Sequence, residues 1–294
     1  MRIITKGTAV GGALALAGSV VALAGPASVA SAASGPAPAP VAHVFVTKAH
    51  QILMPVNLRP GMHKFVVRSG GHAAFQIVRV HGAYTKAQLA HDVNWGLGRS
   101  KVRWEHRFER HTRLLGGVAA SPGHSGTLWV TLRPGNYWVA DTNATPTLPR
   151  KIRTLHVSGA RLVTQAVRSF AHIAAIRDTT WAARPRWIPH TGVLTFTNKA
   201  RDNHFVELAK LAKGKTIADF RRWINKVKSG QNPGRPPLNP AWDMVTGVVS
   251  PGASMQSKYS LAPGHYVLVC WWPDADMGGM PHAFMGMYRG ITLR

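Results

Sequence analysis

The sequence predicts a mainly β protein made of two tandem β-sandwich domains, each with one inserted helix. Three observations support this prediction. Short apolar or alternating runs are separated by Gly, Pro and Asn. A pattern of roughly a hundred residues occurs twice in the same order. Each copy contains a single segment with helical periodicity.

The expected strands are short, as is typical of sandwiches in which turn signals separate the strands. In the first copy they are 44–48, 64–68, 74–80, 128–132 and 137–140. In the second copy they are 193–197, 205–211, 257–261 and 266–270, with a closing strand at 290–293.

One helix is expected in each copy. In the second copy Thr216 and Asp219 form a partial capping box, and apolar residues then recur at helical spacing over 217–227. Thr85 and Gln88 have the same spacing ahead of an expected helix at 86–95. The Arg-rich stretch 99–113 that follows is interpreted as a solvated basic connection.

The repeat is clearest at its turns. Ser121-Pro122-Gly123 matches Ser250-Pro251-Gly252, and Pro134-Gly135-Asn136-Tyr137 matches Pro263-Gly264-His265-Tyr266. A repeat of this length implies two domains of one fold. We expect them at residues 43–159 and 160–294, called here the first half and the second half.

The N-terminus is typical of a cleavable signal peptide. Arg2 and Lys6 precede an uncharged apolar run, and Ala30-Ser31-Ala32 provides small residues for cleavage. We therefore expect residues 1–32 to be removed and the protein to be secreted or held in the cell envelope. Residues 33–42 are expected to be a Pro/Ala linker, and no later segment is long and apolar enough to span a membrane.

The composition limits the classes of function. Thirty-six Lys and Arg against 11 acidic residues give a formal net charge of +25. For an exported chain this charge favours anionic cell-envelope polymers as partners. The basic residues are scattered and no nucleic-acid-binding motif is present, so nucleic acid is not expected. Few carboxylates and no nucleophile or phosphate-loop signature argue against an enzyme.

Metal-binding side chains gather near the C-terminus. Cys270 ends an expected strand, His282 and Met287 follow it, and His204 lies upstream between two expected strands. Two imidazoles, a thiolate and a thioether on a β-sandwich are the ligand set of a blue-copper site. His204, Cys270, His282 and Met287 are therefore the candidate copper ligands.

The second copy resembles the cupredoxin family of blue copper proteins. The resemblance rests on Pro263-Gly264-x-Tyr266-x-x-x-Cys270, then His282, then Gly286-Met287 before a closing strand. It implies a Greek-key sandwich that binds one copper ion for electron transfer to a redox partner. The eleven residues between Cys270 and His282 make the ligand loop longer than is typical of the family.

Two alternatives remain open. Met277, Met280 and Met285 lie close to His282, and thioethers with imidazole suit Cu(I), so the loop could buffer Cu(I). The chain could instead be a metal-free basic binding or structural module of the cell envelope. In the first copy Asp141 takes the position of Cys270, and the following segment has no Met or Cys. We expect that copy to be a degenerate domain without sulfur ligands.

Overall fold

The structure is a computed structural model that describes residues 36–294, which form one compact unit. The expected signal peptide and the first residues of the expected linker lie outside the described residues. Within the described part, the first strand begins at Val41, inside the range expected as linker. No helix among residues 36–294 is long and apolar enough to cross a membrane.

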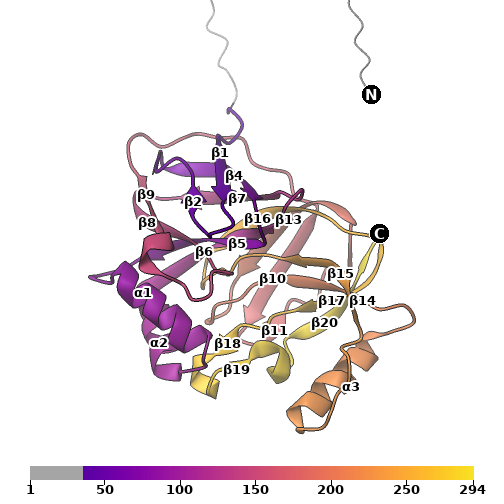
Figure 1. Cartoon of the computed structure of the whole chain (residues 1–294). Helices are drawn as coiled ribbons and strands as arrows, with labels where there is room; N and C mark the ends of the chain where they lie inside the picture. Colours follow the sequence, from indigo (N-terminus) through magenta and orange to yellow (C-terminus); the bar gives the residue numbers. More distant parts are fainter. Residues whose placement is uncertain (1–35) are drawn as a thin grey trace, which may run out of the picture. The chain divides into compact units, whose positions relative to one another are not determined.

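The first half contains nine strands and two α-helices (Figure 1). In chain order these are β1 (Val41–Val46), β2 (Ile52–Leu53), β3 (Asn57–Leu58), β4 (Gly61–Ser69), β5 (Ala73–Val80), α1 (Lys86–Asp92), α2 (Val102–His111), β6 (Thr112–Ala120), β7 (Gly126–Leu132), β8 (Gly135–Asp141) and β9 (Arg153–Val157).

The second half repeats this plan with one α-helix. Its elements are β10 (Ala171–Arg177), β11 (Thr180–Trp181), β12 (Trp187–Ile188), β13 (Thr191–Asn198), β14 (Glu207–Leu211), α3 (Ile217–Lys228), β15 (Leu238–Val245), β16 (Ser254–Ser260), β17 (Gly264–Val269), β18 (Pro273–Asp274), β19 (Met280–Pro281) and β20 (Tyr288–Leu293).

The two halves have the same strand order. In the first, β2-β1-β4-β7 form one sheet and β3-β9-β8-β5-β6 the other. In the second, β11-β10-β13-β16 and β12-β20-β17-β14-β15 take the same places. Parallel pairing also recurs at equivalent positions, between β1 and β4 and between β10 and β13. The mainly β fold and the internal repeat are therefore confirmed.

The halves share one sheet. β7 and β16 pair antiparallel through Trp129 with Gln256 and Leu128 with Ser257. This pairing joins two four-stranded parts into a single eight-stranded sheet, and each half packs its own five-stranded sheet against it. The junction relates the halves by an approximate two-fold arrangement of strands.

Each half has a sandwich core between its two sheets. Phe65 on β4 and Phe75 on β5 lie with ring centroids 6.0 Å apart, and Phe196 on β13 has a similar place in the second half. The buried Tyr137 donates its hydroxyl to the carbonyl of Arg133, and Tyr266 donates to the carbonyl of Ala262. The repeated Pro-Gly-x-Tyr sequence thus fixes the same corner in both halves.

The helices confirm one expectation and correct another. Both capping boxes form, at Thr85 with Gln88 and at Thr216 with Asp219, and α1 and α3 occupy equivalent positions. The interpretation of 99–113 as a solvated connection is wrong. Much of this stretch forms helix α2, which has a charged outer face and a buried face that includes Phe108. The first half therefore carries two helices, not one.

Candidate metal centre

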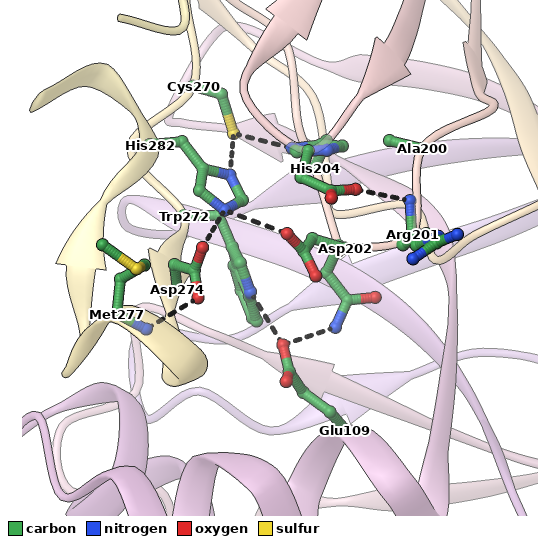
Figure 2. A network of polar contacts seen from close by, with 12 residues as sticks. Glu109, Ala200, Arg201, Asp202, His204, Cys270, Trp272, Asp274, Met277 and His282 are labelled. Carbon is green, nitrogen blue, oxygen red and sulfur yellow. Dashed lines mark hydrogen bonds and ion pairs between the residues drawn. The ribbon is translucent and has the colours of Figure 1, made fainter. Parts of the chain in front are cut away.

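Three of the expected ligands meet in the second half. The thiol sulfur of Cys270 lies 3.7 Å from Nδ1 of His204 and 3.8 Å from Nδ1 of His282 (Figure 2). The three ligand atoms lie within 4.8 Å of one another, and all three side chains are fully buried. A trigonal centre with metal–nitrogen bonds of about 2.0 Å and a metal–sulfur bond of about 2.3 Å requires a nitrogen–sulfur separation of about 3.7 Å. The donor atoms therefore fit a copper ion.

Two neighbouring strands position His204 and Cys270. Cys270 directly follows β17. His204 lies just before β14, the strand that pairs with β17, and forms an isolated β-bridge with Val249. The amide of Asn198 donates to the carbonyls of Asp202 and Val249. These bonds hold the loop that presents His204.

The long ligand loop doubles back on itself. β18 and β19 pair as a small hairpin, and the backbone N–H of His282 donates to the carbonyl of Trp272. Gly278 and Gly279 form the turn at φ values of 72° and 80°, where glycine has no steric penalty. The eleven-residue loop can therefore place His282 beside the Cys270 sulfur, because its additional residues fold into this hairpin.

Met287 is tied to the same centre through its backbone. Its N–H donates to the carbonyl of His282, and its carbonyl accepts from the N–H of Cys270. Its side chain is fully buried in the core. By contrast, Met277 and Met280 are exposed and Met285 is half-buried.

Burial sets the protonation of the centre. It lowers the pKa of His204 to about 3, with a further decrease from the nearby His282, and it lowers the pKa of His282 to about 4. Both imidazoles are therefore neutral near pH 7 and keep a lone pair for a metal. Burial also raises the pKa of the Cys270 thiol to about 12, so metal binding must displace the thiol proton.

The same backbone arrangement exists in the first half with different side chains. The N–H groups of Phe205 and Trp272 donate to the Cys270 sulfur. In the first half, the N–H groups of Ala74 and Asn143 donate to Asp141 at 2.8 and 3.0 Å.

The pairing register extends this equivalence to the first histidine. Ala73 pairs with Ala120, as His204 pairs with Val249. Ala73 therefore takes the place of His204, as Asp141 takes that of Cys270. Neither Ala73 nor Asp141 carries sulfur.

The two-sheet sandwich and the ligand cluster at its end confirm the expected resemblance. The fold is cupredoxin-like. In the second half His204, Cys270 and His282 converge, whereas the equivalent backbone positions of the first half include Ala73 and Asp141.

No protein-family model and no curated protein sequence matches the chain. Among solved structures, a reduced auracyanin from Roseiflexus castenholzii is 19% identical, with a TM-score of 0.28, over 44% of this chain and 99% of that one. Auracyanin A, described as a blue copper protein from Chloroflexus aurantiacus, is 13% identical over 42% and 96%, with a TM-score of 0.26.

A multi-copper oxidase from Pediococcus acidilactici covers more of the chain. It is 10% identical over 87% of this chain and 59% of that one, with a TM-score of 0.22. Likenesses at these scores assign no activity to this chain.

Sequence reasoning missed the contribution of α2 to the site. Glu109 on α2 accepts hydrogen bonds from the Trp272 indole and from the Asn203 amide, both at 3.1 Å. Asn203 precedes His204, and Trp272 follows Cys270 by two residues. The first half therefore holds both ligand-bearing segments of the second. The amphipathic pattern of α2 was the available signal, but it was hidden by the Arg-rich composition.

Carboxylates concentrate around this centre. Six of the 11 acidic residues interact electrostatically with one another or with His282, although the chain carries a net charge of +25. They are Glu105, Glu109, Asp178, Asp202, Asp274 and Asp276. Burial and the neighbouring carboxylates raise the pKa of Asp202 to about 7 and that of Glu105 to about 8.

Trp271 and Trp272 pack on different groups. Trp271 contacts Phe220 on α3 and Phe284, whereas Trp272 packs against Phe108 on α2. Trp272 therefore lies between the two halves, two residues from Cys270.

Proposed function

We propose that the second half would hold one copper ion through His204, Cys270 and His282, with Met287 as a fourth, weak ligand, and would transfer electrons to a redox partner. The observation that carries this proposal is the distance of each imidazole Nδ1 from the Cys270 sulfur, 3.7 and 3.8 Å. A copper ion held in this way supplies one-electron redox chemistry.

The protein contributes a dry and rigid pocket. All four candidate ligands are fully buried, so water is excluded from the metal. The backbone N–H groups of Phe205 and Trp272 orient the sulfur and stabilise its thiolate form. Fixed ligands limit structural change between oxidation states, which favours fast electron transfer.

Cu(II) titration of the purified mature protein tests the proposal. We expect one equivalent of copper to produce an intense visible thiolate-to-copper charge-transfer band that is absent in Cys270→Ser. Met287→Leu is the matched axial variant and should keep the band but shift its energy and the reduction potential. Absence of the band in the wild-type protein would refute the type of site proposed here.

Cu(I) buffering by the loop is a second candidate. Exposure of Met277 and Met280 supports it, because exposed thioethers can capture Cu(I) from solution. A wild-type protein without the charge-transfer band that retains Cu(I), and loses it on replacement of Met277, Met280 and Met285, would favour this function.

We also propose that the mature protein is exported and that its basic surface contacts anionic envelope polymers. Six of the 11 acidic residues interact with one another or with His282, so few remain elsewhere to balance the 34 Lys and Arg that are left without Arg2 and Lys6. Binding to an anionic polymer should weaken steeply with added salt. Salt-insensitive binding would count against this proposal. The expectation that the chain is not an enzyme stays a prediction.

A further inference from the structure

The second nitrogen of the His282 ring lies between two carboxylates, on the side away from Cys270. Nε2 of His282 is 3.8 Å from Oδ2 of Asp202 and 4.0 Å from Oδ2 of Asp274. Ligand atoms of the three residues lie within 4.8 Å of one another. Figure 2 shows both carboxylates turned toward this nitrogen.

These distances are too long for hydrogen bonds, which join nitrogen and oxygen at about 2.7–3.2 Å. Nε2 of His282 is buried and has no hydrogen-bond partner among residues 36–294. A buried polar atom without a partner costs free energy. The space between the three residues therefore suits an additional bonded atom.

The charge at this point also calls for a cation. The carboxylates of Asp178, Asp274, Glu109 and Asp276 interact electrostatically with Asp202. Within residues 36–294, no lysine or arginine forms an ion pair with Asp202 or Asp274. Two neighbouring carboxyl groups thus lack a lysine or arginine partner in a chain of strongly positive net charge.

The dimensions and donor types match a divalent metal ion. A tetrahedral site with bonds of about 2.1 Å has donor–donor distances of about 3.4 Å, so each carboxylate must approach Nε2 by about half an ångström. Rotation of the two aspartate side chains can provide this movement. Two carboxylates and one neutral imidazole suit zinc and other borderline divalent ions, whose charge the carboxylates balance.

We propose that Asp202, Asp274 and Nε2 of His282 form a second cation site, which binds a divalent transition-metal ion such as Zn²⁺. This outer site is separate from the Cys270-centred site and does not depend on the function proposed above. The outer site uses Nε2 of His282, whereas the inner site uses Nδ1 of the same ring.

Zn²⁺ calorimetry on the mature Cys270→Ala protein tests the outer site, because this variant lacks the inner thiolate. We expect one Zn²⁺ per chain. Asp202→Asn and Asp274→Asn in this background should each weaken binding at least about tenfold, since each removes an anionic ligand. Asp276→Asn is the matched control. Its side chain lies in the same loop but is largely exposed, 3.6 Å from His106, and the change should alter affinity less than about twofold.

Two outcomes would overturn the proposal. One is no Zn²⁺ binding by a Cys270→Ala protein whose near-ultraviolet circular dichroism is native. The other is binding that Asp202→Asn and Asp274→Asn leave unchanged, which would place the ion on the histidines alone. Cys270→Ser replaces Cys270→Ala if the latter does not fold. A wild-type protein without blue copper would refute only the inner site, since the outer site is measured without the thiolate.

Discussion

The two halves build the same backbone position and fill it differently. In the second half two N–H groups donate to the Cys270 sulfur, and in the first half two equivalent groups donate to the Asp141 carboxylate. His50 completes the carboxylate's shell at 2.6 Å, whereas His204 and His282 complete that of the sulfur. The scaffold therefore creates a polar socket at the end of the sandwich, and a few side chains decide whether it suits a metal.

The first half, which lacks the candidate ligands, still contributes a side chain next to the site. Its helix α2 supplies Glu109, which binds both segments that carry His204 and Cys270. Figure 1 shows β18 and β19 of the ligand hairpin beside this helix. Gly279 of the hairpin lies close to Glu105 of the helix, since a Cβ added to this glycine would lie 3.8 Å from a Glu105 oxygen. The half that lacks the candidate ligands thus contacts the half that carries them through Glu109.

The comparison of the two sockets predicts the largest loss of stability for a substitution at Asp141. Asp141→Ala leaves two backbone N–H groups and His50 without their acceptor, so the free energy of unfolding should fall by roughly 3 kcal/mol. Cys270→Ala should cost clearly less, because sulfur is a weak acceptor. Urea unfolding of both variants, with Asp141→Asn as the control that keeps one oxygen, measures the difference. Equal costs at the two positions would contradict the comparison.

The next largest effect on stability is expected at Glu105 on α2, and this effect depends on pH. Burial and the carboxylates of Glu109 and Asp274 raise the pKa of Glu105 to about 8. Because the folded state holds this proton more tightly than the unfolded state, the glutamate's contribution to stability falls as pH rises from about 4.5 to about 8.

Glu105→Gln removes this titration. The variant should therefore be more stable than the wild-type protein by roughly 2 kcal/mol at pH 8 and similar to it near pH 4. Thermal or urea unfolding across this range provides the measurement. A pH-independent difference between the two proteins would show that ionisation of Glu105 is not its cause.

The contact between the halves at Glu109 should contribute less to folding stability and more to copper affinity. Glu109→Ala removes the acceptor for Trp272 and Asn203, and we expect copper affinity to fall about tenfold. Glu109→Gln keeps a carbonyl oxygen and should retain most of the affinity. If both variants bound copper as the wild-type protein does, the first half would have no part in holding the ligands.

The exposed methionines should give the smallest effect. Met277→Ala and Met280→Ala remove side chains that lie outside the buried centre. The copper charge-transfer band should therefore stay at the wild-type position, within error, in visible titrations. A shift of the band would mean that these thioethers reach the inner metal.

Most of the fold could be predicted because its signals are local. Alternating apolar runs, two capping boxes and the repeated Pro-Gly-x-Tyr turn predicted strands and helices that the structure confirms to within a few residues. β6, β9, β10 and β15 were missed. β6 follows an Arg-rich stretch and carries Gly116 and Gly117, and β15 contains Pro240. Such residues weaken a strand pattern in sequence, although pairing with β5 and β14 compensates in the fold.

The site was predictable in its residues but not in its surroundings. Cys270 and His282 could be recognised by chemistry, but whether an eleven-residue loop returns depends on the hairpin that Gly278 and Gly279 permit. Glu109 and Asp202 could not be assigned, because their positions depend on how the two halves pack. Contacts between residues far apart in the chain leave no periodic signal in either copy.

The shared eight-stranded sheet has a consequence for the solubility of the protein. If the halves were separate, β7 and β16 would each present an unpaired strand edge seven residues long, which could recruit strands from other molecules. Their mutual pairing, through Trp129 with Gln256 and Leu128 with Ser257, occupies the middle of each edge. The strands left at the margins of this sheet, β2 and β11, are only two residues long and offer little template for further addition. Fusion of the halves therefore protects each from aggregation, and either half expressed alone should self-associate through the strand it normally gives to the other.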